Sequence, residues 1–565
     1  MCGAALAPVV AVAAVAAGTG RTSTGDLVLP LVAVVAAVAV AAYASVRRRL
    51  RAATRTTPGG RAPTVVPLDE LDRRARRLLV EADDWVRTSR EELGWAAAQL
   101  GEDAVRGHAD AVEFAAAELA AALRVRRRLD DGEGDTRVLL DEIVARCGAA
   151  GRRLDAEAAG FDQTRALERT AREALELAET RFEEVAGRVA DADDTLDWLR
   201  ERYALSAYLP VAGHDEQAKD RLAFATACLH RAGRALEEDE TARAVVHLRA
   251  AEAAVDQAAV LVTGIARLAS ALTTAMARLP TALTDTETDL TEAHAQLEAG
   301  SARADLRGRI AYGESVVAEV RGEMGAAGVV RDEAASDSGT GGGRTTRADS
   351  GGGAAGEGGA GVAEASGRCD PVGALRRIEQ VAVGLDRALG RGPGGPRALR
   401  RLERALLVAR GAVGAAADHV TTHRGVVGCE ARTLLAEAER RLREAENTDA
   451  PPVPAPAEAL ADAREADALA RGARQLAERD ARAYGTPYGE GLWTGGAVLG
   501  GILLDAPHPS GGPPGYPGDG GPASYGGPGT RGRRDGGELF RPAQADAPHP
   551  EAPRGTGPRP PARTD

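Results

Sequence analysis

The chain has 565 residues and a formal net charge of −12 at pH 7, with 27% charged and 3% aromatic residues. The negative net charge argues against a general nucleic-acid-binding protein, which would normally present a basic face. The low aromatic content argues against a large α/β core, because alanine and leucine seams between close-packed helices need few aromatic side chains. We therefore expect an all-α protein that binds no nucleic acid.

An uncharged apolar run near the N-terminus predicts a membrane anchor within residues 25–51. The run extends from Leu27 to Val46, and its twenty residues at a rise of about 1.5 Å cover roughly 30 Å, the thickness of a hydrocarbon core. Pro30 lies in the first turn, where its missing N–H is least costly. The alternative is a buried core helix, which rarely lacks charged residues over such a length.

The arginines that follow this run are the residues that determine the predicted topology. Arg47, Arg48, Arg49 and Arg51 come directly after it, whereas only Arg21 precedes it. Positively charged flanks remain on the cytoplasmic side of a membrane. We therefore expect a protein of the cell membrane, with the lipid bilayer as one partner and with its C-terminal body in the cytoplasm.

The N-terminal segment at 1–24 is also apolar. Met1–Ala17 has no basic region at its start, so it is a poor signal peptide. A second, weaker span is the alternative, and it would place the Gly18–Asp26 loop outside the cell. The body stays in the cytoplasm under either interpretation.

A proline- and glycine-containing linker at 52–67 precedes a predicted long-helix region at 68–208. In its first part, apolar and small residues recur at steps of three and four, as on the buried face of a helix. This stripe comprises Leu71, Ala75, Leu78, Ala82, Trp85, Ser89, Leu93, Ala96, Leu100, Ala104, His108, Ala111, Ala115, Leu119 and Ala122. Bends are expected at Gly94, Gly101 and Gly107. A second helical stretch from Thr136 to Tyr203 is expected to be interrupted at Gly151, Gly160 and Gly187, and a break is expected at Leu209–Gly213.

An internal repeat predicts helical hairpin regions at 214–323 and 370–482. Ala244, Leu248, Ala251, Val255, Asp256 and Ala258 match Ala374, Ile378, Val381, Leu385, Asp386 and Ala388 at a constant offset of 130. A weaker copy contains Ala459, Ala463, Ala466, Ala470 and Ala473. Each copy follows another amphipathic segment, which indicates three hairpins whose helices cover each other's apolar stripes. Longer helices at 262–298 and 396–427 would pack on them. The irregular spacing favours simple bundling over a superhelical repeat array.

Two segments are predicted to be disordered from their composition. The insertion at 324–369 is rich in Gly, Ser, Asp and Ala, and it separates the two arms of the second hairpin. The tail at 483–565 is rich in Gly and Pro. Its one apolar patch, Gly491–Leu504, is too short to span a membrane. This patch is interpreted as a sticky part of the tail or as a contact with the membrane surface.

The sequence contains no pattern that predicts catalytic, cofactor-binding or metal-binding residues. His419 and His423 share a helix face at a spacing that zinc sites use, but no third ligand or HExxH pattern accompanies them. The pairs Asp83–Asp84 and Glu183–Glu184 are interpreted as solvated charge. The five cysteines have no metal or redox spacing. Lys219 is the only lysine, so the arginines are interpreted as codon bias of a GC-rich genome and not as phosphate ligands. We expect no enzyme activity and no cofactor.

Three segments resemble the cytoplasmic half of actinobacterial TPM-domain membrane proteins. They are PLDELDRRARRLLVEADD (Pro67–Asp84), PVAGHDEQAKDRLAFA (Pro210–Ala225) and DHVTTHRGVVGCEARTLLAEAERRL (Asp418–Leu442). The resemblance extends from Gly25 to about Phe540. It implies a plan of signal peptide, extracytoplasmic α/β TPM domain, one membrane span, helical body and glycine-rich tail. The TPM domain is the part that the family links with phosphatase activity, and about 24 residues before the anchor are too few to hold it.

Three hypotheses about function follow. The first is a membrane-anchored cytoplasmic helical scaffold that binds protein partners or self-associates through its amphipathic helices. The second is a fragment of a phosphatase-like TPM-domain enzyme whose catalytic domain lies outside this chain. The third is a polymerising coiled coil.

Overall fold

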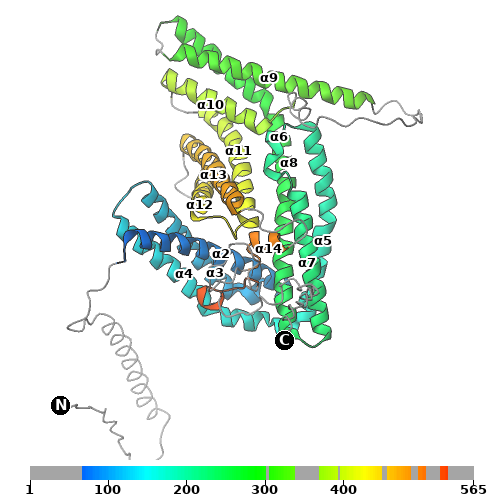
Figure 1. The fold of residues 1–565 in the computed structure, drawn as a ribbon. Helices are drawn as coiled ribbons and strands as arrows, with labels where there is room; N and C mark the ends of the chain where they lie inside the picture. The colour runs from blue at the N-terminus through cyan, green and yellow to red at the C-terminus, as the bar shows by residue number, and fades with distance from the viewer. Residues whose placement is uncertain are drawn as a thin grey trace, which may run out of the picture. The chain divides into compact units, whose positions relative to one another are not determined.

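The structure is a computed structural model that describes residues 66–300, 305–337, 368–391, 395–447, 455–484, 494–503 and 522–531 (Figure 1). The chain divides into two units, 1–67 and 68–565, and nearly all described residues belong to the second. These residues form helices, turns and two isolated bridge contacts, and none of them forms a strand. The predicted all-α fold is confirmed. The predicted anchor, its arginines and most of the linker lie outside the described residues.

The helices of the second unit follow one another with short connections through much of the chain. They are α2 (Leu68–Leu100), α3 (Glu102–Asp130), α4 (Thr136–Arg165), α5 (Leu167–Arg202), α6 (Leu205–Tyr208), η1 (Leu209–Val211), α7 (His214–Glu237), α8 (Thr241–Glu298), α9 (Leu306–Asp337), α10 (Pro371–Leu389), α11 (Gly395–Thr422), α12 (Cys429–Glu446), α13 (Pro456–Tyr484), α14 (Thr494–Leu499) and α15 (Pro528–Arg531).

The helices α2, α3 and α4 pack on one another around an apolar core. Most of the predicted stripe is buried in this core, including Leu71, Trp85 and Leu119. Of the three predicted bends, only Gly101 separates two helices, and its φ of 89° lies in the left-handed region that glycine adopts without strain. Gly94 and Gly107 lie inside helices.

The break between α4 and α5 differs from the prediction. It falls at Ala166, whose φ of 47° ends α4, and its N–H donates to the carbonyl oxygen of Asp162 at 2.8 Å. Gly151 and Gly160 lie inside α4, and Gly187 lies inside α5. Packing explains the glycine at position 151, since a Cβ atom there would lie only 2.7 Å from the Pro528 side chain.

Three helical hairpins are present, formed by α7 with α8, α9 with α10, and α12 with α13. The repeated apolar residues of 244–258 and 374–388 are mostly buried on the second helix of their hairpins. The separate helix expected at 262–298 is instead continuous with the repeat, because α8 runs unbroken from Thr241 to Glu298 and accommodates Pro280 in its interior.

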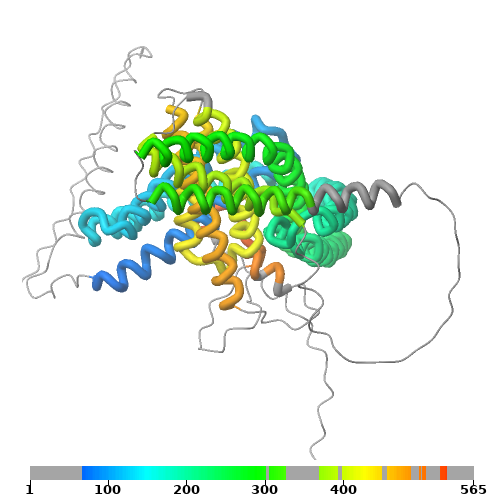
Figure 2. Tube along the Cα trace, turned by 90° about the horizontal axis from the view of Figure 1, so that it is seen from above, coloured from blue at the N-terminus to red at the C-terminus, as the bar shows by residue number. Residues whose placement is uncertain are grey.

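The helix α8 is long and apolar enough, by length and composition, to cross a membrane, and it is the one such helix in the described part of the chain. Within the body it packs on α5, α7, α9, α10 and α11 (Figures 1 and 2). It also buries polar side chains, including Arg249, Glu252 and Gln257. These side chains pair with other parts of the body, so α8 is built as its central helix.

The helix α9 continues to Asp337, which lies within the predicted insertion at 324–369. The composition of this insertion suggested disorder from residue 324, but alanine, valine and glutamate after Gly325 extend the helical backbone. Residues 338–367 lie outside the described residues.

Two segments of the predicted disordered tail pack on the body. In the first, α14 leads into a turn through Gly500 and Gly501, and Ile502 is buried in the same core as α5, α7 and α8. The Gln257 side chain donates from Nε2 to the Gly500 carbonyl oxygen at 2.7 Å. The apolar patch of the tail is therefore neither free nor on a membrane surface where it is described, because it completes this core.

The second tail segment, 522–531, crosses the α2–α4 bundle. The Tyr525 ring stacks on Phe161 with centroids 4.2 Å apart. The backbone N–H groups of Gly527, Gly529 and Thr530 each donate to the Asp155 carboxylate at 3.0 Å. A Cβ atom at Gly527 would lie 2.2 Å from the Gly151 carbonyl oxygen. The glycines that suggested disorder thus allow a close approach of two backbones.

Candidate functional site

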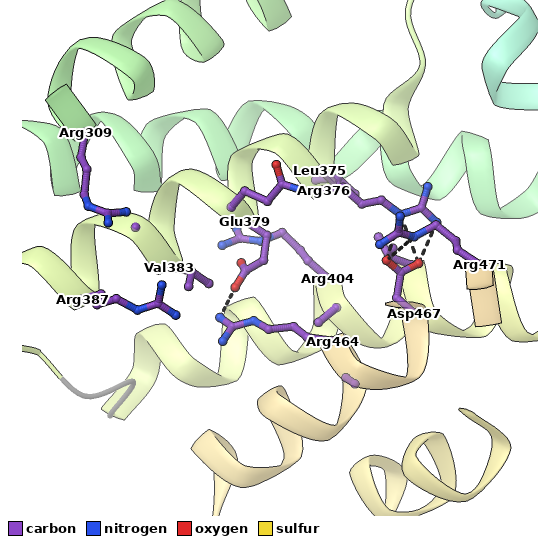
Figure 3. Close-up of a pocket in the computed structure, with 15 residues that line it drawn as sticks. Arg309, Leu375, Arg376, Glu379, Val383, Arg387, Arg404, Arg464, Asp467 and Arg471 are labelled. Carbon is purple, nitrogen blue, oxygen red and sulfur yellow. Dashed lines mark hydrogen bonds and ion pairs between the residues drawn. The ribbon is translucent and has the colours of Figure 1, made fainter. Parts of the chain in front are cut away.

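An arginine-lined pocket of about 320 Å³ lies between four helices, α9, α10, α11 and α13 (Figure 3). Six arginines and two carboxylates line it. Those residues are Arg309, Arg376, Arg387, Arg404, Arg464 and Arg471, with Glu379 and Asp467. It has a larger excess of arginines over carboxylates than the pocket between α2, α3 and α12, where six arginines face four carboxylates, so we take it as the candidate site.

The periodicity of α10 positions one wall of this pocket. Its apolar residues, among them Ala374, Ile378 and Val381, pack toward α9 and the core. Arg376, Glu379, Val383 and Arg387 follow one another at steps of three and four, so they share another face of the helix. This second face lines the pocket opposite α13.

Ion pairs connect α10 with α13 across the pocket. Arg376 donates to Asp467 through Nε at 3.1 Å and through Nη2 at 2.8 Å, and Arg471 donates to the same carboxylate at 3.2 Å. Glu379 accepts from Arg464 of α13 and from Arg401 of α11, the latter at 3.1 Å. Each carboxylate of the pocket therefore serves two arginines.

Three further arginines converge on the opposite end of the pocket. Figure 3 shows the guanidinium groups of Arg309, Arg387 and Arg404 turned toward the space beside Val383. Arg309 donates from Nε to Asp305 at 2.8 Å, and Arg404 donates from Nη1 to Asp285 at 2.9 Å. Neither of these two carboxylates lines the pocket.

The electrostatic consequence is a concentration of positive charge at a partly enclosed site. Arg401, behind the pocket, is 8% exposed; burial lowers its pKa, but Glu379 and Asp386 outweigh burial and raise the pKa above its ordinary value. Guanidinium groups are planar forks that bind carboxylates and phosphates through two parallel hydrogen bonds. The arrangement can bind and orient an oxyanion.

The residues on which the sequence analysis focused lie elsewhere. Arg47, Arg48, Arg49 and Arg51 lie outside the described residues. His419 and His423 stack with ring centroids 4.2 Å apart near the end of α11. The Nε2 atom of His419 and the Nδ1 atom of His214 are buried without a hydrogen-bond partner. Among the described residues, no group of three or more metal-ligating side chains has the geometry to hold a metal ion.

The acidic pair Asp83–Asp84 is not the solvated charge that was expected. Asp83 is 7% exposed and Arg432 donates to both carboxylates, at 2.5 Å to Asp83 and at 2.7 Å to Asp84. Burial raises the pKa of Asp83, but Arg87 and Arg432 outweigh burial and lower it below the ordinary value. Since Arg432 lies about 350 residues away in the sequence, this pairing had no local signal. Glu183 and Glu184 are exposed, as expected.

The four described cysteines are free and buried. Burial raises the pKa of Cys147, Cys228 and Cys369 to about 12, and it also raises that of Cys429. Thiolates at these positions are disfavoured at neutral pH, and a thiol is a poor nucleophile.

A second arginine cluster, missed by the sequence analysis, lies between α2, α4 and α8. Arg165 is 1% exposed and donates to Glu92 at 2.6 Å and to Glu252 at 2.5 Å. Arg249 pairs with Glu92 at 3.1 Å and with Asp162 at 3.2 Å. Two arginines thus share three carboxylates in this buried network, one side of which lines a pocket of about 610 Å³.

Sequence similarity connects the chain with two proteins of Mycobacterium tuberculosis. UPF0603 protein MT2410 of strain CDC 1551 / Oshkosh and UPF0603 protein Rv2345 of strain ATCC 25618 / H37Rv are each 32% identical to it over 468 residues. The match covers 80% of this chain and 64% of each relative, so the chain spans less than two thirds of the length of these curated relatives. No family model and no solved structure matches the chain. The chain is therefore similar to two longer mycobacterial proteins over most of its own length.

Proposed function

We propose that this chain is a membrane-anchored helical scaffold that holds protein partners at the cytoplasmic side of the cell membrane. The observation that carries this proposal is the continuity of α8. Its 58 residues correspond to about 87 Å of helix. Its first half packs with α5 and α7, and its second half packs with α9 and α10. One rigid helix thus fixes the spacing of separate helical hairpins, which is what a scaffold needs.

The anchor is supported by sequence. The uncharged run from Leu27 to Val46 and the arginines at 47–51 support a membrane span with the body on the cytoplasmic side. The resemblance to the C-terminal half of TPM-domain membrane proteins supports the same plan.

Exposed apolar side chains on separate helices provide positions at which to test for partners. Tyr312 on α9 is 50% exposed and Leu399 on α11 is 51% exposed. A photo-crosslinking amino acid at either position of the full chain, expressed in its native host, should yield a reproducible adduct in the membrane fraction. The matched control is the same amino acid at Val320, which is buried on α9 and should give no intermolecular adduct.

Deletion of residues 27–46 should release the chain from the membrane fraction and remove adducts with membrane-associated partners. A full chain that is monomeric by sedimentation and gives no adduct at Tyr312 or Leu399 would contradict the scaffold role. Concentration-dependent sedimentation into long assemblies would favour the polymerising coiled coil.

An enzyme fragment is the second candidate, because the relatives are longer than this chain. Under this alternative, the body is the cytoplasmic half of a TPM-domain phosphatase-like protein. The nucleotides upstream of the codon for Met1 test it. An in-frame segment that encodes a signal peptide and an α/β domain favours the enzyme, and a nearby in-frame stop codon argues against it.

A further inference from the structure

The end of the arginine-lined pocket at Gly384 holds guanidinium N–H groups that can donate to a bound anion. Arg309 and Arg404 each use one nitrogen on a carboxylate outside the pocket, and a guanidinium group has five N–H donors. The Nε atom of Arg464 is buried without a hydrogen-bond partner. This N–H donor lies on a side chain that lines the pocket, so it is available to an acceptor bound there.

Gly384 leaves room for an arginine at this end of the pocket. A Cβ atom at Gly384 would lie 3.0 Å from an Nη atom of Arg309. The absence of a side chain at Gly384 therefore lets the Arg309 guanidinium lie against α10, on the same side as Arg387. The three guanidinium groups of Arg309, Arg387 and Arg404 can face one small ligand (Figure 3).

The size and walls of the pocket restrict the ligand. A volume of about 320 Å³ is at the lower end for small-molecule sites, and it excludes a nucleic-acid strand or a helical peptide. Leu375, Val383 and Val408 give the pocket an apolar wall beside the arginines. Such a pocket suits a small molecule with a charged head and a short, less polar body.

The number and direction of the cations favour phosphate over carboxylate as the head. A carboxylate has two oxygens and one charge, and Asp467 and Glu379 of this pocket each already accept from two arginines. A phosphate monoester has three terminal oxygens and a charge of about −1.5 to −2 at pH 7, which matches three converging guanidinium groups.

We infer that the pocket between α10 and α13 binds the phosphate group of a small phosphate monoester, held by Arg309, Arg387 and Arg404. Glu379 limits the affinity, because its negative charge lines the same pocket. Binding at this site is independent of whether the body recruits a protein partner. The phosphate can belong to a soluble metabolite or to the headgroup of a lipid such as phosphatidic acid.

The test uses the full chain in detergent micelles, with glycerol 3-phosphate and inorganic phosphate as soluble probes in isothermal titration calorimetry. Flotation with phosphatidylcholine vesicles, with and without phosphatidic acid, tests the lipid source. Saturable binding of a soluble ester, or binding that requires phosphatidic acid, supports the site, and the pattern distinguishes its source. If none of these probes binds at concentrations up to about 10 mM, the upper end of weak but specific affinities, the proposal is overturned.

Substitutions of pocket residues test whether phosphate binding occurs in this pocket. Arg387→Gln and Arg404→Gln should each weaken binding at least tenfold, whereas Arg410→Gln should leave it unchanged. Arg410 is the matched control because it lies on α11, pairs with Glu446 and does not line the pocket. Glu379→Gln should strengthen binding several-fold, which an unfolded variant cannot do. Equal affinity in the wild type and in the Arg387→Gln/Arg404→Gln double variant would overturn the assignment.

Discussion

The two arginine clusters of this protein differ in their supply of carboxylates and in their access to water. In the buried network, Arg165 and Arg249 share Glu92, Glu252 and Asp162, and Arg165 is almost fully buried. In the pocket, six arginines face two carboxylates in a cavity of about 320 Å³. A buried charge must be paired by the protein itself, whereas a charge beside a cavity can be paired by a ligand. The same residue type therefore serves internal structure in one region and recognition in the other.

The largest expected effect on stability comes from removing Arg165 from the buried network. Arg165→Ala leaves Glu92 and Glu252 buried without their main partner, and such a loss costs about 3–5 kcal/mol in unfolding free energy. Thermal unfolding followed by circular dichroism should show a large decrease in Tm. The control Arg106→Ala removes an exposed pair with Asp103 and should cost less than about 1 kcal/mol. A small effect at Arg165 would mean that the two clusters do not differ as described.

The next effect concerns the tail segment that crosses the bundle beside this network. Gly527→Ala places a Cβ atom against the Gly151 carbonyl oxygen, which cannot move aside as a side chain can. We expect a loss of about 1–3 kcal/mol, typical of overpacking, and faster hydrogen exchange at residues 525–530. Gly107→Ala is the matched control, since nothing lies near its Cβ position, and it should be neutral or stabilising. Unchanged exchange in Gly527→Ala would show that the segment does not require this contact.

Buried histidines provide a third environment, in which burial keeps the side chains neutral. Burial, together with Arg474 and His214, lowers the pKa of His419 to about 4, and burial lowers the pKa of His423 to about 3. Because these values lie below 6.5, the stability that neutral histidines contribute is present above pH 6.5 and is lost as the pH falls toward 4. Burial raises the pKa of the adjacent Asp418 to about 6, so its contribution has the opposite sign and is lost as the pH rises through 6.

Replacement of one histidine separates these opposing contributions. His419→Gln should make the loss of stability between pH 6 and pH 4 shallower, by up to about 1 kcal/mol per pH unit. Unfolding midpoints in urea at pH 7, 6, 5 and 4 measure this slope. His294→Gln alters an exposed histidine on α8 and should leave the slope unchanged. A steeper slope in His419→Gln would contradict the sign derived from its pKa.

The smallest expected effect is on stability at the pocket. Arg387→Gln should change the unfolding free energy by less than about 0.5 kcal/mol, because the side chain lies beside a cavity and not in a closed core. Set against Arg165→Ala in the same thermal assay, this variant measures the contrast between the two clusters directly. A loss of several kcal/mol would show that the pocket arginines are structural.

Hydrophobic periodicity predicted much of this architecture. Two sequence patterns identified helices and hairpins: the stripe that begins at Leu71, and the repeat shared by 244–258 and 374–388. When one face of a helix is buried, its apolar residues recur every three or four positions, and a short stretch of sequence is enough to show this spacing. The roles of individual glycines were not readable in the same way. Gly101 separates two helices, whereas Gly151 lies inside one and gives room to a distant backbone.

The pocket could not be predicted because its charges come from four separated helices. Arg309, Arg387, Arg404 and Arg464 are each ordinary on their own helix, and only the tertiary structure brings them together. The high overall arginine content suggested codon bias and no binding site. Codon bias explains how often arginine occurs in the chain, but it does not explain where each arginine lies in the fold. Even on α10, where Arg376, Glu379 and Arg387 share a face, no local pattern identifies the helix that faces them.

The tail that returns to the α2–α4 bundle has a consequence for the timing of biosynthesis. Residues 522–531 follow α4 by about 360 residues, and ribosomes add roughly 5–20 residues per second. The N-terminal bundle therefore waits on the order of tens of seconds for Tyr525 to cover Phe161. The part of its hydrophobic surface around Phe161 is exposed throughout that interval, which makes the nascent chain a substrate for chaperones.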